Sequence, residues 1–264
     1  MHGGRCRLVL HFHFYDNKIK YKNNYLIFRQ PEQENIMNYP WILFDADETL
    51  FHFYSFVGLQ TMLARYGVAF GEADYAKFQA VNQPLWLRYQ QGEIDMTTLA
   101  QTRFADLAAQ LNRPALALNE ELQHTMARLS EPLAGARELL AWLHGRGVKL
   151  GIMTNGFASL QQPRLQYTGF AEFFDLLIIS EHESHPKPHR AIFESALRKM
   201  GNPPPETVLM VGDSLTSDIL GGNRVGMATC WLNSANKPNE TNIIPTFTVH
   251  NWVELGNIFG FQAA

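Results

Sequence analysis

The sequence predicts an α/β protein: a parallel β-sheet wrapped by helices, with an all-helical domain inserted after the first strand. Two observations carry this prediction. Five short apolar runs, each flanked by Gly, Asp or Asn, alternate with helical patterns of the length that connects parallel strands. One stretch breaks the alternation, because residues 55–130 contain helical patterns and no convincing strand.

The first strand is predicted at residues 41–44, where WILF ends directly before Asp45. Similar apolar runs predict four further strands, at 148–153, 175–179, 207–212 and 228–232. Helical patterns accompany them at about 134–146, 157–168, 189–200, 215–226 and 251–259. Ligands of such sheets bind beyond the carboxyl ends of the strands. Four polar residues fall at those ends: Asp45, Thr154, Ser180 and Asp213.

The inserted segment is predicted to form four helices, at about 55–66, 72–91, 95–111 and 118–130. Gly67, Gly92 and the turn at 112–114 separate them, and Pro132 and Gly135 mark the return to the core. We therefore expect an α/β core made of residues 37–54 and 131–264. We expect residues 55–130 to form a helical cap over the strand ends.

Residues 1–36 differ from the rest in composition. They carry six Lys and Arg against three Asp and Glu, whereas the remaining 228 residues carry 16 against 22. We favour the interpretation that translation starts at Met37, so that this N-terminal extension is read-through sequence or a disordered tail. The alternatives are a basic, aromatic arm that touches nucleic acid or membrane, and an added edge strand.

Composition, net charge and cysteine content exclude several classes of protein. The chain has 264 residues, of which 46% are hydrophobic and 18% charged, as is ordinary for a soluble globular protein. No apolar run approaches the roughly 20 residues needed to cross a bilayer. The net charge of −3 argues against a dedicated nucleic-acid binder. Two cysteines, Cys6 and Cys230, cannot form a disulfide framework and fit the reducing cytoplasm, and Cys230 is expected in the core.

Asp45 and Asp47 are the most informative residues, because both follow directly on the first predicted strand. Two acids at i and i+2 on a strand exit can converge on one ligand. Together they can supply a nucleophile and a proton-transfer group. An acid pair after a strand is more often part of a solvated loop. Residues elsewhere in the chain are therefore needed to distinguish a catalytic site from such a loop.

Further polar residues fall at the same predicted edge. Asp213 ends another strand and Asp218 follows five residues later, so that with Asp45 they form an oxygen set suited to Mg²⁺. Helix capping is the alternative explanation for Asp213. Thr154 and Asn155 end a strand at a helix start and could hold an oxyanion, or form a plain turn. A lone lysine such as Lys187 is usually a surface charge.

Four segments in this order resemble the signature motifs of the haloacid dehalogenase superfamily: DADET from Asp45, TNG from Thr154, KP from Lys187, and GDSLTSD ending at Asp218. The resemblance covers residues 41 to about 259 and implies a Rossmann-like core with a C1-type helical cap. It also implies a mechanism. Asp45 would attack phosphorus and form an aspartyl-phosphate, while Asp47, protonated at first, would serve the leaving group and then the hydrolytic water.

The same resemblance implies the binding residues. Mg²⁺, or Mn²⁺ as an alternative, would bind the carboxylates of Asp45 and Asp213 and the backbone carbonyl of Asp47, with Asp218 as a direct ligand or orienting a bound water. Thr154 and Asn155 would bind the phosphoryl oxygens, and Lys187 would pair with Asp45 and the phosphate. The expected partner is a small-molecule nucleotide, with no nucleic acid and no membrane; the oligomeric state stays open.

Several activities remain open within this superfamily. Asp47 argues for a phosphatase over a 2-haloacid dehalogenase, whose first motif lacks the second aspartate. Glu48 and Thr49 argue against a phosphomutase, which typically has Gly in this place. Sugar phosphates or other small phosphate esters are the alternative substrates. A non-catalytic nucleotide-binding regulator with intact motifs is a third class.

Longer segments resemble one bacterial subfamily, the pyrimidine 5′-nucleotidases, which hydrolyse UMP, dUMP and dTMP. These segments are DADETLFHF, NQPLW in the cap, TNGFASLQQ, VLMVGD and ATCWLN. The resemblance includes the cap and implies a nucleoside 5′-monophosphate substrate. Candidate contacts for base and ribose are Phe51, Phe53, Asn82, Trp86, Arg88 and Tyr89. For Trp86 and Tyr89 the alternative is the cap's own core.

The segment before Lys187 departs from the family pattern, because Ser184 stands where relatives commonly place Gly. This puts the local backbone shape in doubt. His182, His185 and His189 surround the same segment. A transition-metal site is one interpretation, but we favour solvated loop histidines.

Overall fold

The structure is a computed structural model that describes residues 38–183 and 185–261. Residues 34–264 form one compact unit, which contains every described helix and strand. The predicted N-terminal extension, residues 1–36, lies outside the described residues, and so does Ser184.

A six-stranded parallel sheet lies at the centre of the unit, in the order β3-β2-β1-β4-β5-β6. Its strands are β1 (Trp41–Phe44), β2 (Lys149–Thr154), β3 (Leu176–Ile179), β4 (Val208–Gly212), β5 (Ala228–Leu232) and β6 (Phe247–Val249). β1 pairs with β2 on one side and β4 on the other. The five predicted strands are present within one residue of their predicted bounds, and the parallel sheet is confirmed.

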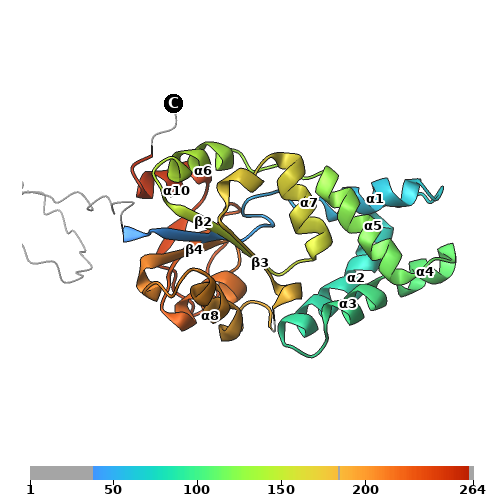
Figure 1. The fold of residues 1–264 in the computed structure, drawn as a ribbon. Coiled ribbons are helices and arrows are strands. Elements are labelled where there is room, and N and C mark those ends of the chain that lie inside the picture. The colour runs from blue at the N-terminus through green and yellow to red at the C-terminus, as the bar shows by residue number, and fades with distance from the viewer. Residues whose placement is uncertain (1–37, 184, 262–264) are drawn as a thin grey trace, which may run out of the picture. The chain divides into compact units, whose positions relative to one another are not determined.

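Helices cover both faces of the sheet (Figure 1). Ile42 and Phe44 of β1 pack with α6 (Ala136–His144), α7 (Ala158–Thr168) and α10 (Trp252–Ile258). Leu43 points to the opposite face and packs with α8 (Arg190–Lys199), next to α9 (Leu220–Val225). This alternation follows from the two-residue period of a strand, and it explains why β1 is apolar throughout.

Residues 55–130 form helices and no strand, as the sequence predicts. The helices are α1 (Ser55–Ala64), α2 (Glu72–Gln90), α3 (Met96–Arg103), α4 (Ala105–Leu111) and α5 (Ala115–Arg128). They gather beyond one end of the sheet (Figure 1). A helical insertion between β1 and β2 is the arrangement expected of a C1-type cap, and we call these residues the cap.

Three details differ from the prediction. The predicted helix 95–111 is two helices, because the backbone leaves helical geometry at the fully buried Phe104. The predicted helix 215–226 begins with a π-helical turn, Leu215–Ile219, before α9. β6 was not predicted, because three residues in a polar, Pro-containing stretch give no clear strand pattern. Short 3₁₀ turns complete the unit at Ala171–Phe173, Ser180–His182 and Pro205–Thr207.

The helix α7 belongs to the core and also supports the cap. Leu165, in the second half of α7, packs into the apolar core cluster that contains Ile42 and Phe44 of β1. Leu160, in the first half of α7, packs into the apolar cluster of the cap. The residues before α7 are the strand end of β2, so the cap rests on the helix that starts at a predicted ligand-binding edge. Among the described helices, none is both long and apolar enough to span a bilayer.

Candidate active site

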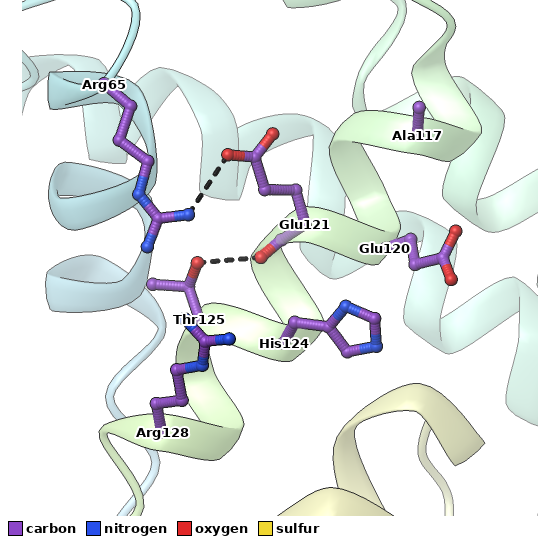
Figure 2. Close-up of a pocket in the computed structure, with 7 residues that line it drawn as sticks. All are labelled: Arg65, Ala117, Glu120, Glu121, His124, Thr125 and Arg128. Carbon is purple, nitrogen blue, oxygen red and sulfur yellow. Dashed lines mark hydrogen bonds and ion pairs between the residues drawn. The ribbon is translucent and has the colours of Figure 1, made fainter.

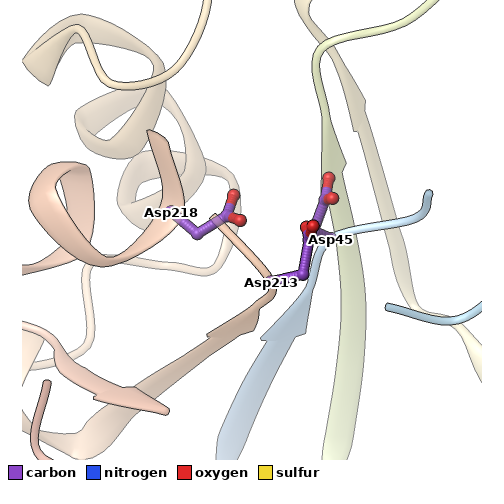
Figure 3. Close-up of side chains that lie close together, drawn as sticks. All are labelled: Asp45, Asp213 and Asp218. Carbon is purple, nitrogen blue, oxygen red and sulfur yellow. The ribbon is translucent and has the colours of Figure 1, made fainter. Parts of the chain in front are cut away.

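Three carboxylates meet at the carboxyl edge of the sheet (Figure 3). Asp45 follows β1, Asp213 follows β4, and Asp218 lies in the π-helical turn after Asp213. One oxygen from each lies within 4.8 Å of the others. Neighbouring parallel strands end at the same edge, so the sheet itself brings Asp45 and Asp213 together. The predicted oxygen set is therefore assembled in space.

Lys187 lies inside this acidic cluster, with 2% of its side chain exposed. Its ammonium donates to Oδ1 of Asp45 at 2.6 Å, to Oδ1 of Asp218 at 2.6 Å and to the carbonyl of Met153 at 2.7 Å. An ammonium has three N–H groups, so all of them have acceptors. Lys187 is therefore a buried part of the cluster and not a surface charge.

The electrostatics follow from three acids and one buried base. Burial raises the pKa of Asp45 well above its ordinary value, against the opposing effect of Lys187, and Asp218 and Asp213 raise it further. Burial and the neighbouring Asp218 raise the pKa of Asp213 to about 7. Burial alone would lower the pKa of Lys187, but Asp218 and Asp45 outweigh it and hold this pKa above its ordinary value.

Gly212 explains how Asp218 reaches the cluster. A Cβ at Gly212 would overlap the Asp218 carboxylate, so the last residue of β4 has to be glycine for Asp218 to pack there. The other oxygen of Asp218 accepts a hydrogen bond from the backbone N–H of Ser214 at 3.1 Å. This short loop therefore fixes Asp218 from two sides.

Asn155 holds the loop that carries Lys187. Its amide donates to the Lys187 carbonyl at 2.8 Å and accepts from the Lys187 N–H at 2.8 Å. The Asn155 side chain is thus committed to the Lys187 backbone in this structure, which makes it a positioning group in addition to its predicted phosphate contact. Thr154 is buried, and its hydroxyl lies 3.5 Å from Nε2 of Gln161.

Asp47 has a partner that sequence reasoning missed. Its Oδ1 lies 2.6 Å from Nη1 of Arg164, a guanidinium that is 1% exposed. The same guanidinium donates to Ser130 and Gln161 and lies over the ring of Phe51. The ion pair fixes the position of the Asp47 carboxylate, which the predicted mechanism uses for proton transfer. A signal existed in the sequence, because Arg164 follows the apolar Leu160 by four residues and so falls on the same helical face.

The residues predicted as substrate contacts after β1 occupy different surroundings. Phe51 is fully buried and packs on Phe170 with 5.2 Å between ring centroids. It therefore belongs to the core and offers no surface to a substrate. Phe53 is 41% exposed, and its backbone N–H donates to Glu48 at 2.8 Å.

The predicted contacts on α2 also differ from one another in burial and in bonding partners. Arg88 is exposed and pairs with Glu93 at the far end of the helix. Tyr89 is buried and donates to the Ser180 hydroxyl beyond β3 at 2.8 Å. Trp86 packs edge-on against Phe157, the residue after the TNG segment. Asn82 is half-buried and accepts from Arg103, a second buried arginine that sequence reasoning missed.

The remaining predictions concern histidine and cysteine. His185 and His189 stack with 3.8 Å between ring centroids. Among the described residues, the acidic trio is the one group with metal-type spacing, and no histidine belongs to it. Cys230 is fully buried in β5, as predicted, and burial raises the pKa of its thiol.

A separate hollow of about 360 Å³ lies on the cap between α1 and α5 (Figure 2). Its lining is mostly charged and consists of Arg65, Ala117, Glu120, Glu121, His124, Thr125 and Arg128. Arg65 and Glu121 pair with each other at 3.3 Å. The hollow contains none of the acidic cluster and carries no feature that the site chemistry requires.

The acidic cluster fits a hard divalent cation. Its donors are carboxylate oxygens, and three acids face a single ammonium, so negative charge is in excess. Mg²⁺ prefers oxygen ligands of this kind and is commonly held by one or two carboxylates together with substrate phosphate. Asp213 is the most open of the three, and its carboxylate bonds no other residue within the described part of the chain, so it is available as a ligand.

A parallel sheet with a nucleophile-type aspartate at its central strand, a buried lysine and a helical insertion defines one class of protein. Residues 39–226 match the family model of the haloacid dehalogenase-like hydrolases, and the chain belongs to that family. The particular relatives are informative as well. The pyrimidine 5′-nucleotidase YjjG of Escherichia coli is 49% identical over 219 residues, which cover 83% of this chain and 97% of the relative.

Two further comparisons agree with this assignment. The pyrimidine 5′-nucleotidase PynA of Streptococcus pneumoniae is 33% identical, over 83% of this chain and 94% of the relative. The crystal structure of the HAD-hydrolase YfnB from Bacillus subtilis, bound to magnesium, matches with a TM-score of 0.74 and 28% identity. The match covers 84% of this chain and 99% of that chain.

Proposed function

We propose that this chain is a Mg²⁺-dependent 5′-nucleotidase that hydrolyses pyrimidine nucleoside 5′-monophosphates through an aspartyl-phosphate on Asp45. One observation supports the proposal above all others. The 49% identity to a pyrimidine 5′-nucleotidase runs through 97% of that relative, so the likeness includes the cap as well as the core. The cap lies over the strand ends and is the natural place for substrate selection.

Asp45 is the nucleophile in this proposal. Its carboxylate attacks phosphorus, the bond to the ester oxygen breaks, and the nucleoside leaves as an alcohol. Lys187 lies 2.6 Å from Asp45 and reduces the repulsion between this carboxylate and the phosphate. Asn155 keeps Lys187 in place through two backbone hydrogen bonds. Thr154, Asn155 and Lys187 bind phosphoryl oxygens in this proposal.

Asp47 moves the protons. It gives a proton to the leaving oxygen, and it then takes one from the water that attacks phosphorus and regenerates Asp45. Arg164, whose Nη1 lies 2.6 Å from Oδ1 of Asp47, holds this side chain in place in the absence of substrate. The leaving oxygen needs the same Asp47 oxygen atoms that face Arg164, so we propose that substrate binding shifts the Asp47 side chain.

Asp45, Asp213 and the backbone carbonyl of Asp47 would hold Mg²⁺, or Mn²⁺ as an alternative, with Asp218 as a direct ligand or orienting a bound water. The ion, when bound, supplies charge neutralisation for the phosphoryl group. The magnesium-bound structure of YfnB supports this part of the proposal. We also propose residues 55–130 as the cap domain and 37–54 with 131–264 as the core, and action on free nucleotides in the cytoplasm.

Phosphate release from a panel of monophosphates tests the proposal. We expect Mg²⁺-dependent activity that favours UMP, dUMP and dTMP over purine nucleotides. Flat activity, or a preference for sugar phosphates, would support the alternative of a general phosphatase. Activity on 2-haloacids without metal would overturn phosphoryl chemistry altogether.

Asp47→Asn tests the proton-transfer role separately. The asparagine keeps the shape and the backbone carbonyl but can neither donate nor accept this proton. We expect metal binding to survive, as measured by calorimetry, while turnover is lost. Near-normal turnover would show that another group moves the proton.

A further inference from the structure

Arg103 is a buried cation in the middle of the cap. It is the last residue of α3, and 8% of it is exposed. Nε and Nη2 donate to Oδ1 of Asn119, and Nη1 donates to Oδ1 of Asn82 at 3.3 Å. Its guanidinium also lies over the rings of Phe157, at 4.8 Å from the centroid, and Phe104, at 5.4 Å.

This arginine has no carboxylate partner among the described residues. Its hydrogen-bond acceptors are two neutral amides, and burial lowers the pKa of Arg103 to about 9 with no acidic neighbour opposing it. The side chain is therefore still charged at neutral pH. Burying an uncompensated charge is costly, and a chain rarely does so for packing alone. Two of the five guanidinium N–H groups remain without an acceptor in the described part of the chain, because the two asparagines use three.

Phe157 connects Arg103 to the segment that follows β2. Phe157, on which Arg103 stacks, is two residues from Asn155, so their Cα atoms are at most about 7 Å apart. Phe157 and Asn119 also form part of the wall of a cavity of about 490 Å³. Apolar side chains of Met96, Ala100 and Leu116 line the same cavity, together with polar residues that include Glu120 and Glu181. Arg103 lies behind this wall, in contact with Asn119 and Phe157.

The face of α2 that carries Asn82 runs along this region. Tyr75, Gln79, Asn82, Trp86 and Tyr89 recur at helical spacing and therefore share one face. One end bonds Ser55, at the start of α1, and the other bonds Ser180, beyond β3. Gln79 and Asn82 join the Tyr75 end to Arg103 through hydrogen bonds. This face of α2 is thus polar and aromatic, whereas the packed face of a cap helix is ordinarily aliphatic.

We propose that Arg103, braced by Asn82 and Asn119 and stacked on Phe157, is the residue that recognises the nucleobase, donating its two remaining N–H groups to a carbonyl oxygen of the pyrimidine. The inference rests on the proposed function and names the group that selects its substrate. Carbonyl oxygens are the acceptors that every pyrimidine base offers. An abasic sugar phosphate offers none of them, so Arg103 contributes to turnover of nucleotides and not to turnover of ribose 5-phosphate.

The test compares two substrates in the same full-length variants. In Arg103→Gln we expect kcat/KM for UMP to fall about 10- to 100-fold, the effect of losing a charged hydrogen bond to substrate. We expect kcat/KM for ribose 5-phosphate to change less than about threefold. Arg113→Gln is the matched control, because Arg113 is also a cap arginine lying over an aromatic ring, Tyr66, but on an exposed surface.

A second variant guards against misfolding of the first. Asn82→Ala removes one brace at a half-buried position, and we expect a smaller, roughly 3- to 10-fold loss for UMP with ribose 5-phosphate again unchanged. Equal losses on both substrates would assign Arg103 a structural role and overturn the inference, as would an unchanged preference for UMP. A wild-type enzyme with no preference for UMP over ribose 5-phosphate would instead overturn the proposed function.

Discussion

At the scale of single residues, the site depends on one buried ammonium that joins two carboxylates. Lys187 bonds Asp45 and Asp218 at 2.6 Å each. All three side chains are largely buried, so solvent screens these two ion pairs only weakly. Such a group both positions the proposed nucleophile, Asp45, and offsets its negative charge. Removing it leaves two acids facing each other in a buried place.

Lys187→Met should therefore cost both stability and activity. Breaking a buried ion pair by removing one partner costs about 3–5 kcal/mol, because an uncompensated charge stays behind. We expect a loss of this size in the free energy of unfolding, measured with denaturant, and turnover below detection. Lys77→Met is the control, since Lys77 is an exposed cap lysine paired only weakly with Asp74. A fully stable, active Lys187→Met would contradict the described geometry.

In the proposed metal site, Asp213 would make metal binding depend on pH. Its folded pKa of about 7 lies above the ordinary value of 3.8, so the metal-free protein favours the protonated carboxyl group below about pH 7. The protonated Asp213 carboxyl group therefore contributes to the free energy of unfolding below about pH 4. This contribution is lost as the pH rises through about 7. A metal needs the carboxylate, so protons compete with it.

We expect the apparent Mg²⁺ affinity to weaken about tenfold per pH unit below 7 and to level off above it. Calorimetric titrations at about pH 6 and pH 8 measure this difference. The rise in melting temperature caused by Mg²⁺ should accordingly be larger at pH 8. In Asp213→Asn both the Mg²⁺ effect and its pH dependence should disappear, and a pH-independent affinity in the wild type would contradict the assignment.

At the scale of elements, the loop between β4 and α9 places Asp218 with little tolerance. Gly212→Ala would push a Cβ into the Asp218 carboxylate, which has to move and take its bond to Lys187 with it. Misplacement of a site group by about 1 Å costs on the order of 100-fold in rate. We expect a loss of that order in kcat/KM with the fold retained by circular dichroism. Gly71→Ala, at an open position in the cap, should leave kcat/KM unchanged.

The sequence was most informative about the strands, because a strand buried on both faces is apolar along its whole length. It also placed Asp45, Thr154 and Asp213 at one edge, since parallel strands end together. It could not show that Arg164 reaches Asp47 or that Arg103 reaches Asn82, because these pairs are 117 and 21 residues apart and depend on packing. Phe51 was expected beside the ligand, but its ring turns into the core against Phe170.

The sequence does contain a signal for the burial of Arg103. This arginine continues the face formed by Met96, Leu99 and Ala100, all of which are buried, so a charged residue falls on the apolar side of its helix. The split of the predicted helix 95–111 left no such signal. It arises because Phe104 turns fully into the apolar cluster of the cap, which is a tertiary effect.

At the scale of the whole unit, one buried hydrogen bond joins the α2 end of the cap to the core. Tyr89 and Ser180 are 91 residues apart, and the bond between their hydroxyls measures 2.8 Å. Tyr89→Phe removes this bond and keeps the ring. We expect a loss of about 1 kcal/mol in the free energy of unfolding and faster amide exchange in α2 and α3.

The control for that experiment is Tyr167→Phe, since Tyr167 is an exposed tyrosine of α7, 59% accessible, whose hydroxyl bonds none of the described residues. Exchange in β1 and β4 should be the same in both variants. If amide exchange of α2 does not respond to Tyr89→Phe, the cap is held by the packing of α5 on α7 and not by this bond.

The central position of β1 has a consequence for motion. Its backbone is paired on both sides, and even the N–H of Asp45 donates to Val211 at 2.9 Å. Strands of this kind exchange their amide protons only when the whole unit unfolds, whereas the surrounding helices open locally and often. Asp45, the proposed nucleophile, is thus anchored in the slowest part of the molecule. In the proposed function, substrate can enter and product can leave by motion of the cap while the backbone of Asp45 stays fixed.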